Sequence, residues 1–99
     1  MVEIKIFLDE GDRHEDGPMY EYIMRYLMHN GIQGASILPV FAGFGGKHHL
    51  NLPNSIGSVD EVPLVILFID EVEKVNIVLP HLKEILRKNL IIKTSIEKI

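Results

Sequence analysis

The first positions of the chain alternate between apolar and polar residues, from Val2 to Leu8. This period of two predicts a strand with one buried face, although Phe7 adds an apolar side chain to the polar side. From Pro18 onward the apolar residues recur at helical spacing, and Gly31 follows as a C-terminal cap. The helical stripe consists of Tyr20, Ile23, Met24, Leu27 and Met28. These patterns predict a strand and an amphipathic helix, joined by a charged loop over residues 10–17.

Two further apolar segments predict strands over residues 35–41 and 62–69. Pro39 places the first of these strands at a sheet edge or a bulge, because proline cannot donate a hydrogen bond to a ladder. The second segment is apolar at nearly every position, which predicts a central strand that is covered on both faces.

Asp70, with Glu73 three positions later, indicates the start of a second helix. Pro80 lies inside the helical pattern, so we expect it to kink or split this helix. The apolar stripe of the helix consists of Val75, Val78, Leu79, Leu82, Ile85 and Leu86. A last strand is expected from about Ile91 to Lys98.

The predicted order is β-α-β-β-α-β in one domain, residues 1–99. Right-handed crossovers place the first and third strands at the centre and both helices on one face. The fold class is therefore α+β, a ferredoxin-like split sandwich with a long loop between strands two and three. Phe7 and one face of residues 62–69 then point to water. Because contiguous apolar patches usually mark interfaces, we expect other copies of the chain to cover this face.

Composition narrows the class of protein. The formal net charge of −4 argues against a general nucleic-acid binder, and the absence of cysteine excludes disulfides and thiolate metal sites. No apolar run approaches the roughly 20 residues of a membrane span, and the N-terminus has no secretory signal pattern. We expect a cytoplasmic protein that neither binds nucleic acid nor inserts into a membrane.

The segment over residues 43–61 is rich in glycine, histidine, asparagine and serine. Connections longer than roughly 12–15 residues are mostly functional or disordered, so function is sought here first. Gly43-Phe-Gly-Gly-Lys47 offers backbone donors and a positive charge to an anion. It is not a Walker motif, because Phe41 stands where the first glycine belongs and His48 follows the lysine. A simple bend and a bend with ligand contact both remain open.

Other polar groups give weaker signals. His48 and His49 suggest a metal site, but adjacent residues of an extended chain point to opposite sides, so ligands from other copies would be needed. Tyr22 and Tyr26 form an i, i+4 pair away from the core stripe, either at an interface or on the surface. No nucleophile elbow and no triad pattern is present, so the sequence predicts no enzyme.

Several pieces together resemble the PII-like family known as domain of unknown function 190, over nearly the whole chain. They are Leu8-Asp-Glu10, Gly17-Pro-Met-Tyr20, Gly31-Ile-Gln-Gly-Ala-Ser36, Gly43-Phe-Gly45 with His49 downstream, Val62-Pro63 and Leu79-Pro-His-Leu82. The resemblance implies a ferredoxin-like subunit of a PII-type homotrimer. The loop over residues 43–61 corresponds to the T-loop, through which PII regulators contact partner proteins.

The resemblance also implies a ligand site at subunit boundaries, near the base of that loop. A small anionic ligand such as an adenine nucleotide would bind there, and ordering of the loop would signal to a partner, such as a membrane transporter. The site residues are Gly43, Phe44, Gly45, Gly46 and Lys47, with Arg13 or His49 closing the site. The alternative is a metal-binding protein resembling the CutA group, with loop histidines as ligands.

Two departures from the family pattern bear on this hypothesis. The family commonly has an arginine-glycine pair after the alanine segment of its second strand. Here that region reads Leu38-Pro-Val-Phe41, so the phosphate contact from that arginine is lost. No tyrosine lies between Phe41 and Val62, which argues against control by uridylylation.

Overall fold

The computed structural model describes residues 1–43 and 62–99. Within these ranges the helices are α1 (Met19–His29) and α2 (Val72–Ile85). The strands are β1 (Val2–Asp9), β2 (Arg13–His14), β3 (Gly17–Pro18), β4 (Ala35–Pro39), β5 (Pro63–Asp70) and β6 (Ile91–Ser95).

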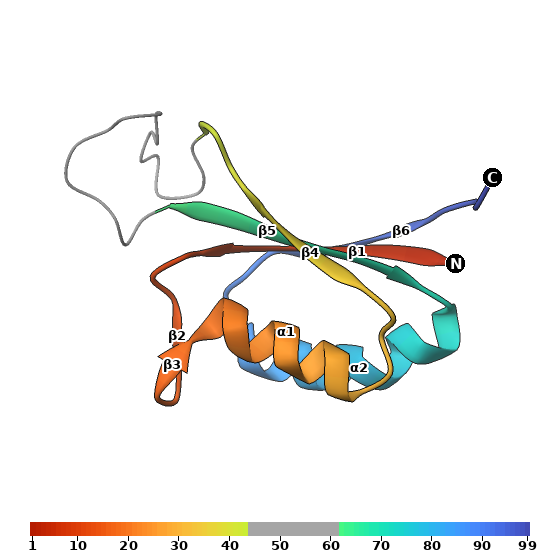
Figure 1. Ribbon diagram of the computed structural model, residues 1–99, viewed down its shortest axis with the longest axis horizontal. Helices are drawn as coiled ribbons and strands as arrows, with labels where there is room; N and C mark the ends of the chain where they lie inside the picture. The colour runs from red at the N-terminus through yellow and green to blue at the C-terminus, as the bar shows by residue number, and fades with distance from the viewer. Residues whose placement is uncertain (44–61) are drawn as a thin grey trace.

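Four of these strands form an antiparallel sheet in the order β4-β5-β1-β6. The central strands β1 and β5 pair along their whole length, with Val2 opposite Asp70 and Asp9 opposite Pro63. Both helices lie on one side of the sheet, and no described element covers the other side (Figure 1). The predicted α+β, ferredoxin-like βαββαβ fold is confirmed, with residues 44–61 connecting β4 to β5.

The core lies between the sheet and the helices, because alternate residues of β1 and β5 face α1 and α2. Ile4, Ile6 and Ile66 are completely buried on this side. The helices contribute Ile23, Leu27, Val75, Val78 and Leu82 to the same cluster. The predicted helical stripes are mostly confirmed, but the prediction that Met28 belongs to the buried stripe is wrong, because this residue is 64% exposed. Gly31 ends α1 as predicted, with φ of +87°, where an L side chain would be strained.

Three local expectations from the sequence are corrected. The charged loop over residues 10–17 contains a short hairpin, in which Arg13 and His14 of β2 pair with Pro18 and Gly17 of β3. The strands predicted over residues 35–41 and 91–98 end earlier, at Pro39 and Ser95.

The second helix also differs from its prediction. It begins at Val72, and Asp70 is instead the last residue of β5, where pairing with Val2 keeps it in the sheet. Pro80 does not split α2, which is continuous from Val72 to Ile85. Pro80 and Asn76 are both exposed, so water can bond the Asn76 carbonyl that proline leaves without a donor.

Candidate functional site

The base of the long connection lies where the ends of three strands meet. The backbone N–H of Val40 donates to the carbonyl of Pro63 at 2.9 Å, which holds the end of β4 against the start of β5. The N–H of Glu10 donates to the carbonyl of Val62 at 2.8 Å and extends the pairing of β1 with β5. The sheet therefore supplies a fixed support on both sides of residues 44–61.

A tight turn follows β1 at the same end of the sheet. The carboxylate of Asp12 accepts a hydrogen bond from the backbone N–H of Asp9 at 3.1 Å, as short polar side chains commonly do in turns. The carbonyl of Asp12 accepts from the N–H of Met19 at 2.8 Å. Asp12 thus connects the end of β1 to the first turn of α1 and positions the hairpin β2–β3 between them.

The structure describes two of the predicted anion-site residues. The segment that follows β4 and ends at Gly43 rises on the uncovered side of the sheet, whereas the β2–β3 hairpin, which contains Arg13, lies on the helix side (Figure 1). The exposed Arg13 guanidinium donates to the carbonyl of Asp16 at 3.0 Å, within the hairpin itself. Both residues lie at the same end of the sheet. The other predicted members, Phe44, Gly45, Gly46, Lys47 and His49, lie outside the described residues.

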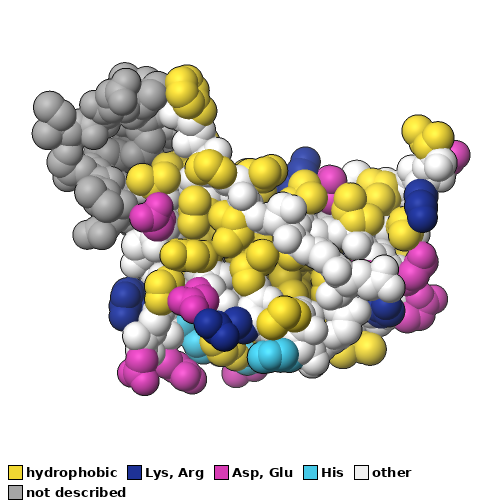
Figure 2. Space-filling view, viewed as in Figure 1, with side chains coloured by type: hydrophobic (Ala, Val, Ile, Leu, Met, Phe, Trp, Pro, Cys, Tyr) yellow, Lys and Arg dark blue, Asp and Glu magenta, His cyan; other side chains and the backbone are white. Residues whose placement is uncertain are grey.

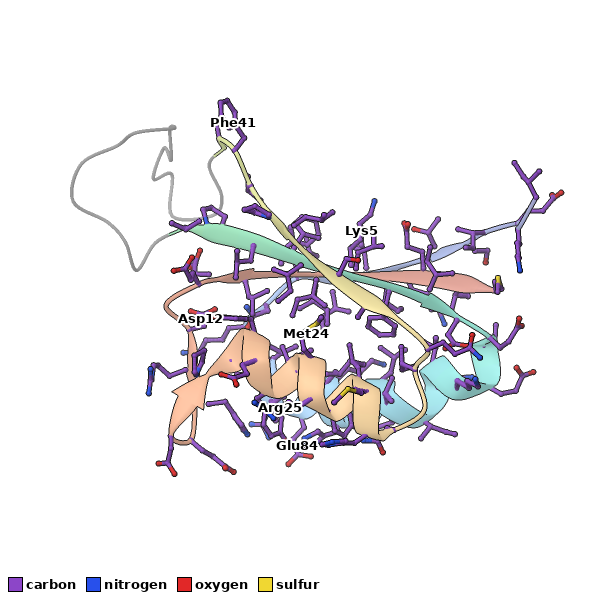
Figure 3. All side chains as sticks on the ribbon, viewed as in Figure 1. Lys5, Asp12, Met24, Arg25, Phe41 and Glu84 are labelled. Atoms are coloured by element: carbon purple, nitrogen blue, oxygen red, sulfur yellow. The ribbon has the colours of Figure 1, made fainter. Side chains whose placement is uncertain are left out.

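The uncovered side of the sheet is largely apolar. Phe7 lies opposite Val65, and Val65 lies opposite Leu38, so one row of apolar side chains crosses three strands. Leu67, Ile69 and Ile92 continue this surface along the sheet. Hydrophobic side chains follow this side of the sheet, and Lys5 points away from the helices among them (Figures 2 and 3). We call this surface the open face; its residues are Glu3, Lys5, Phe7, Ser36, Leu38, Val65, Leu67, Ile69, Ile92 and Thr94.

A second cluster joins the two helices and the hairpin. The Tyr22 hydroxyl lies 2.7 Å from Nε2 of His81, in hydrogen-bonding contact between α1 and α2. The His14 ring packs on Tyr22 with 4.1 Å between ring centres, and Tyr26 packs on His81 at 4.7 Å. Burial and the neighbouring Tyr22 raise the pKa of the Tyr26 phenol.

Sequence reasoning missed this cluster as a unit. It treated Tyr22 and Tyr26 as an interface or surface pair, and the structure places His14 and His81 against them. The available signal was the i, i+4 spacing of the two tyrosines, which predicts a shared contact on one side of the helix.

Asp70 is the one buried charged residue among those described, with 5% of its surface exposed. Burial alone would raise its pKa, but the backbone N–H groups of Glu71 and Gln33 and the ammonium of Lys74 lower the pKa below its ordinary value. The two backbone donors lie 2.8 and 3.1 Å from the carboxylate. Asp70 therefore ties the end of β5 to the segments that follow α1 and precede α2.

A groove of about 500 Å³ lies between α1 and the edge strand β4. Its apolar lining includes Met24, Met28 and Ile32, and an ion pair of Arg25 with Glu21 at 2.8 Å borders it. Figure 3 shows Met24 and Arg25 on the same helix. Nothing in the described residues identifies an occupant for this groove.

Residues 1–43 and 62–99 bear on the predicted metal alternative and on membrane insertion. This part of the chain contains no group of three or more histidine or acidic residues placed to hold a metal ion. The predicted metal alternative used His48 and His49, which lie outside it, so that alternative stays a prediction. No helix in the described ranges is long and apolar enough to cross a bilayer.

The fold is PII-like. A solved structure of CPII from Thiomonas intermedia K12, bound to ADP and bicarbonate, matches with a TM-score of 0.63 and 16% sequence identity. The match covers 96% of this chain and 84% of the CPII chain. At this identity the likeness concerns the fold.

Sequence comparison then gives the family. The model of the DUF190 family, described as "Uncharacterized ACR, COG1993", matches residues 1–98, and the chain belongs to this family. The UPF0166 protein MJ1524 of Methanocaldococcus jannaschii is 38% identical over 93 residues, which cover 93% of this chain and 85% of that relative. A UPF0166 protein of Aquifex aeolicus is 28% identical over 80 residues, covering 81% and 76% of the two chains. The resemblance inferred from the sequence motifs is thereby confirmed.

Proposed function

We propose that this chain is the subunit of a small homotrimeric ligand sensor, and that it binds an anionic ligand such as an adenine nucleotide at the boundaries between subunits. The observation that carries this proposal is the open face, which lies beside the base of the long connection. A subunit that covers the open face would bring its edge to the strand ends around Gly43. The boundary between two copies and the predicted anion site would then coincide.

The apolar side chains of the open face support self-association. Phe7 is 37% exposed, Ile69 38% and Leu38 48%. Burying a large apolar side chain contributes about 1.5–3 kcal/mol, so covering several of them favours an assembly strongly. The PII-like fold supports the same assignment, since the CPII structure of this fold contains ADP and bicarbonate.

In the proposed mechanism the chain performs no chemical reaction. The backbone of Gly43, Gly45 and Gly46 would donate hydrogen bonds to the anion, and Lys47 would neutralise its charge. Binding would favour one arrangement of residues 44–61 and so change the surface offered to a partner protein, such as a transporter.

Thermal unfolding with a panel of ligands tests this function. AMP, ADP, ATP, cyclic AMP and bicarbonate are each added at millimolar concentration, with sedimentation analysis of the same samples. A ligand present at 100 times its dissociation constant stabilises the folded state by about 2.7 kcal/mol, so at least one nucleotide should raise the midpoint by several degrees.

The matched control replaces a lysine at the other end of the molecule. With Lys47→Ala, the ligand concentration that gives the same rise in the unfolding midpoint should increase at least about tenfold, since the substitution removes a charge-assisted contact. Lys98→Ala, near the C-terminus at the end opposite the loop base, should leave the shift unchanged (Figure 1). An assembled protein that no nucleotide stabilises would contradict the nucleotide assignment, and a monomer at micromolar concentration would contradict the assembly.

A further inference from the structure

A charged pair lies in the middle of the apolar open face. Lys5, on the central strand β1, has Leu67 opposite it on β5 and Ile92 opposite it on β6. Its ammonium nitrogen lies 3.4 Å from the carboxylate of Glu3, two residues away on the same face. The Lys5 side chain projects away from the helices (Figure 3).

Both groups are only partly accessible in the single chain. The side chain of Lys5 is 38% exposed and that of Glu3 is 20% exposed. Among the paired positions of the four strands, the charged residues on this side are Glu3, Lys5 and, at the end near the long connection, Asp9. Any molecule that covers the centre of the open face must therefore contact the ion pair of Lys5 and Glu3.

Covering the face removes water from this pair. A lysine ammonium has three N–H donors, and within the chain the Lys5 ammonium has an ion pair with Glu3 at 3.4 Å. Removing a charge from water is costly unless opposite charge and hydrogen bonds replace the water. A purely apolar partner surface would leave Lys5 without further acceptors, so the chemistry of the face selects against such a partner.

A second copy of the chain has the complementary chemistry. It presents the same apolar residues and the same pair, one positive and one negative group, so its Glu3 can accept from Lys5 and its Lys5 can donate to Glu3. Contacts of this kind are available in both isologous and ring-closing assemblies, since every copy contributes one group of each sign.

We propose that Lys5 and Glu3 form ion pairs between copies of this chain, and that these contacts fix the register in which the open faces pack together. The apolar residues supply the association energy, and the charged pair disfavours registers in which two ammonium or two carboxylate groups face each other. This inference rests on the self-association in the proposed function and assigns it a specific determinant.

Charge reversal of one member at a time tests the proposal. Lys5→Glu gives each chain two negative groups on the open face, and Glu3→Lys gives each chain two positive groups. Sedimentation equilibrium should show the dissociation constant raised at least about tenfold in each variant, because like charges then meet between copies.

Mixing the two variants separates contacts between copies from contacts within one chain. An equimolar mixture of the Lys5→Glu and Glu3→Lys chains should form mixed oligomers at least about tenfold more tightly than either variant alone, because opposite charges meet again. A double variant that carries both Glu3→Lys and Lys5→Glu restores one group of each sign to every chain. If this double variant assembles well but the mixture of single variants shows no gain, the pair acts within one chain and the proposal is overturned.

Lys93→Glu is the matched control, since it makes the same charge change on β6 but Lys93 lies opposite Ile4, on the other side of the sheet. It should leave the dissociation constant within about twofold of the parent value. Circular dichroism checks that each variant is folded, and Lys5→Met replaces Lys5→Glu if the latter is not. Lys5→Met should also weaken association, because Glu3 then loses its cation. If the parent assembles and the single reversals assemble equally well, this inference fails while the proposed function stands; a monomeric parent overturns both.

Discussion

The two faces of the sheet are made from the same strands, but the helices of the chain bury only one of them. Ile66 and Ile69 lie three positions apart on β5, so the pleat sends them to opposite sides. Ile66 is completely buried against the helices, whereas Ile69 is 38% exposed on the open face. One chain covers the first face by itself, whereas no described element covers the second face (Figure 1).

The difference lies in what each face can recruit along the chain. Each strand-helix connection returns an amphipathic helix to the same side, since both crossovers have the same hand. Nothing in residues 1–43 and 62–99 is placed to cover the other side (Figure 1). Comparable apolar side chains therefore stabilise the fold on one face and are available for association on the other.

The largest effect is expected at the helix-covered face. Ile66→Ala removes a fully buried side chain and leaves a cavity, so the free energy of unfolding should fall by about 2–5 kcal/mol. Denaturant unfolding measures this value. A loss below about 1 kcal/mol would mean that the helix-covered face is not the tightly packed core described here.

Asp70 tests the polar connection on the covered side. Asp70→Asn weakens acceptance from the N–H groups of Gln33 and Glu71, and should cost about 1–3 kcal/mol at pH 7. The folded-state pKa of Asp70 is lowered, so its stabilising effect is complete above the ordinary carboxyl pKa. That effect is lost as pH falls through the lowered value.

Thermal unfolding at several pH values checks the direction of this linkage. The difference in midpoint between the parent protein and Asp70→Asn should be constant from pH 8 to about pH 5 and shrink under more acidic conditions. Glu71→Gln, at a residue whose carboxylate shows no such contacts, is the matched control. A difference that grows in acid would contradict the assignment.

The helix-to-helix contact should have a smaller effect. Tyr22→Phe removes the hydroxyl that contacts His81 but keeps the ring, so we expect a loss of about 0.5–1.5 kcal/mol in denaturant unfolding. Tyr20→Phe is the control, since it removes the same group on the same helix. Equal losses in the two variants would show that the contact between Tyr22 and His81 contributes no specific stability.

The smallest effect on the single chain is expected on the open face. Ile69→Ala should change the unfolding free energy of the dissociated chain by less than about 1 kcal/mol, because its side chain already contacts water. At higher protein concentration the loss should grow, since the open face is then covered. Unfolding at two concentrations measures this, and a concentration-independent loss as large as that of Ile66→Ala would remove the distinction between the two faces.

The hydrophobic pattern was a reliable guide to the elements that pack against one another. Alternation from Val2 to Leu8 and the helical stripes of α1 and α2 predicted the buried residues because burial follows the period of each element. The fully apolar segment over residues 62–69 was correctly placed at the sheet centre. Prediction failed at Met28, which was assigned to the apolar stripe but lines the groove beside β4 with 64% of its surface exposed.

Local capping chemistry was less reliable than periodicity. Asp70 has a side chain suited to begin a helix, but its pairing with Val2 keeps it in β5 and moves the helix start to Val72. Pro80 was expected to interrupt α2, yet its exposed position lets the helix continue. The hairpin of β2 and β3 was not expected, because two-residue strands have no period that a sequence can display.

The candidate ligand site stays a prediction, because most of its residues lie outside the described ranges. Glycine-rich composition located the connection between β4 and β5, and the structure places Gly43 at its base and Arg13 on the hairpin at the same end of the sheet. No sequence period brings His81 to Tyr22 or sets Lys5 beside Leu67 and Ile92, because these contacts join segments that are distant along the chain.

The sequence by itself determined the order of elements, the buried faces and the fold class, since local periodicity and the handedness of crossovers leave few arrangements for a chain of this pattern. Only the tertiary structure decided the strand register, the position of the charged pair within the open face and which rings meet between the helices. The physical reason is that these features depend on strand register and on packing between distant segments. A one-residue shift in the register of a strand would move each of its side chains to the other face of the sheet.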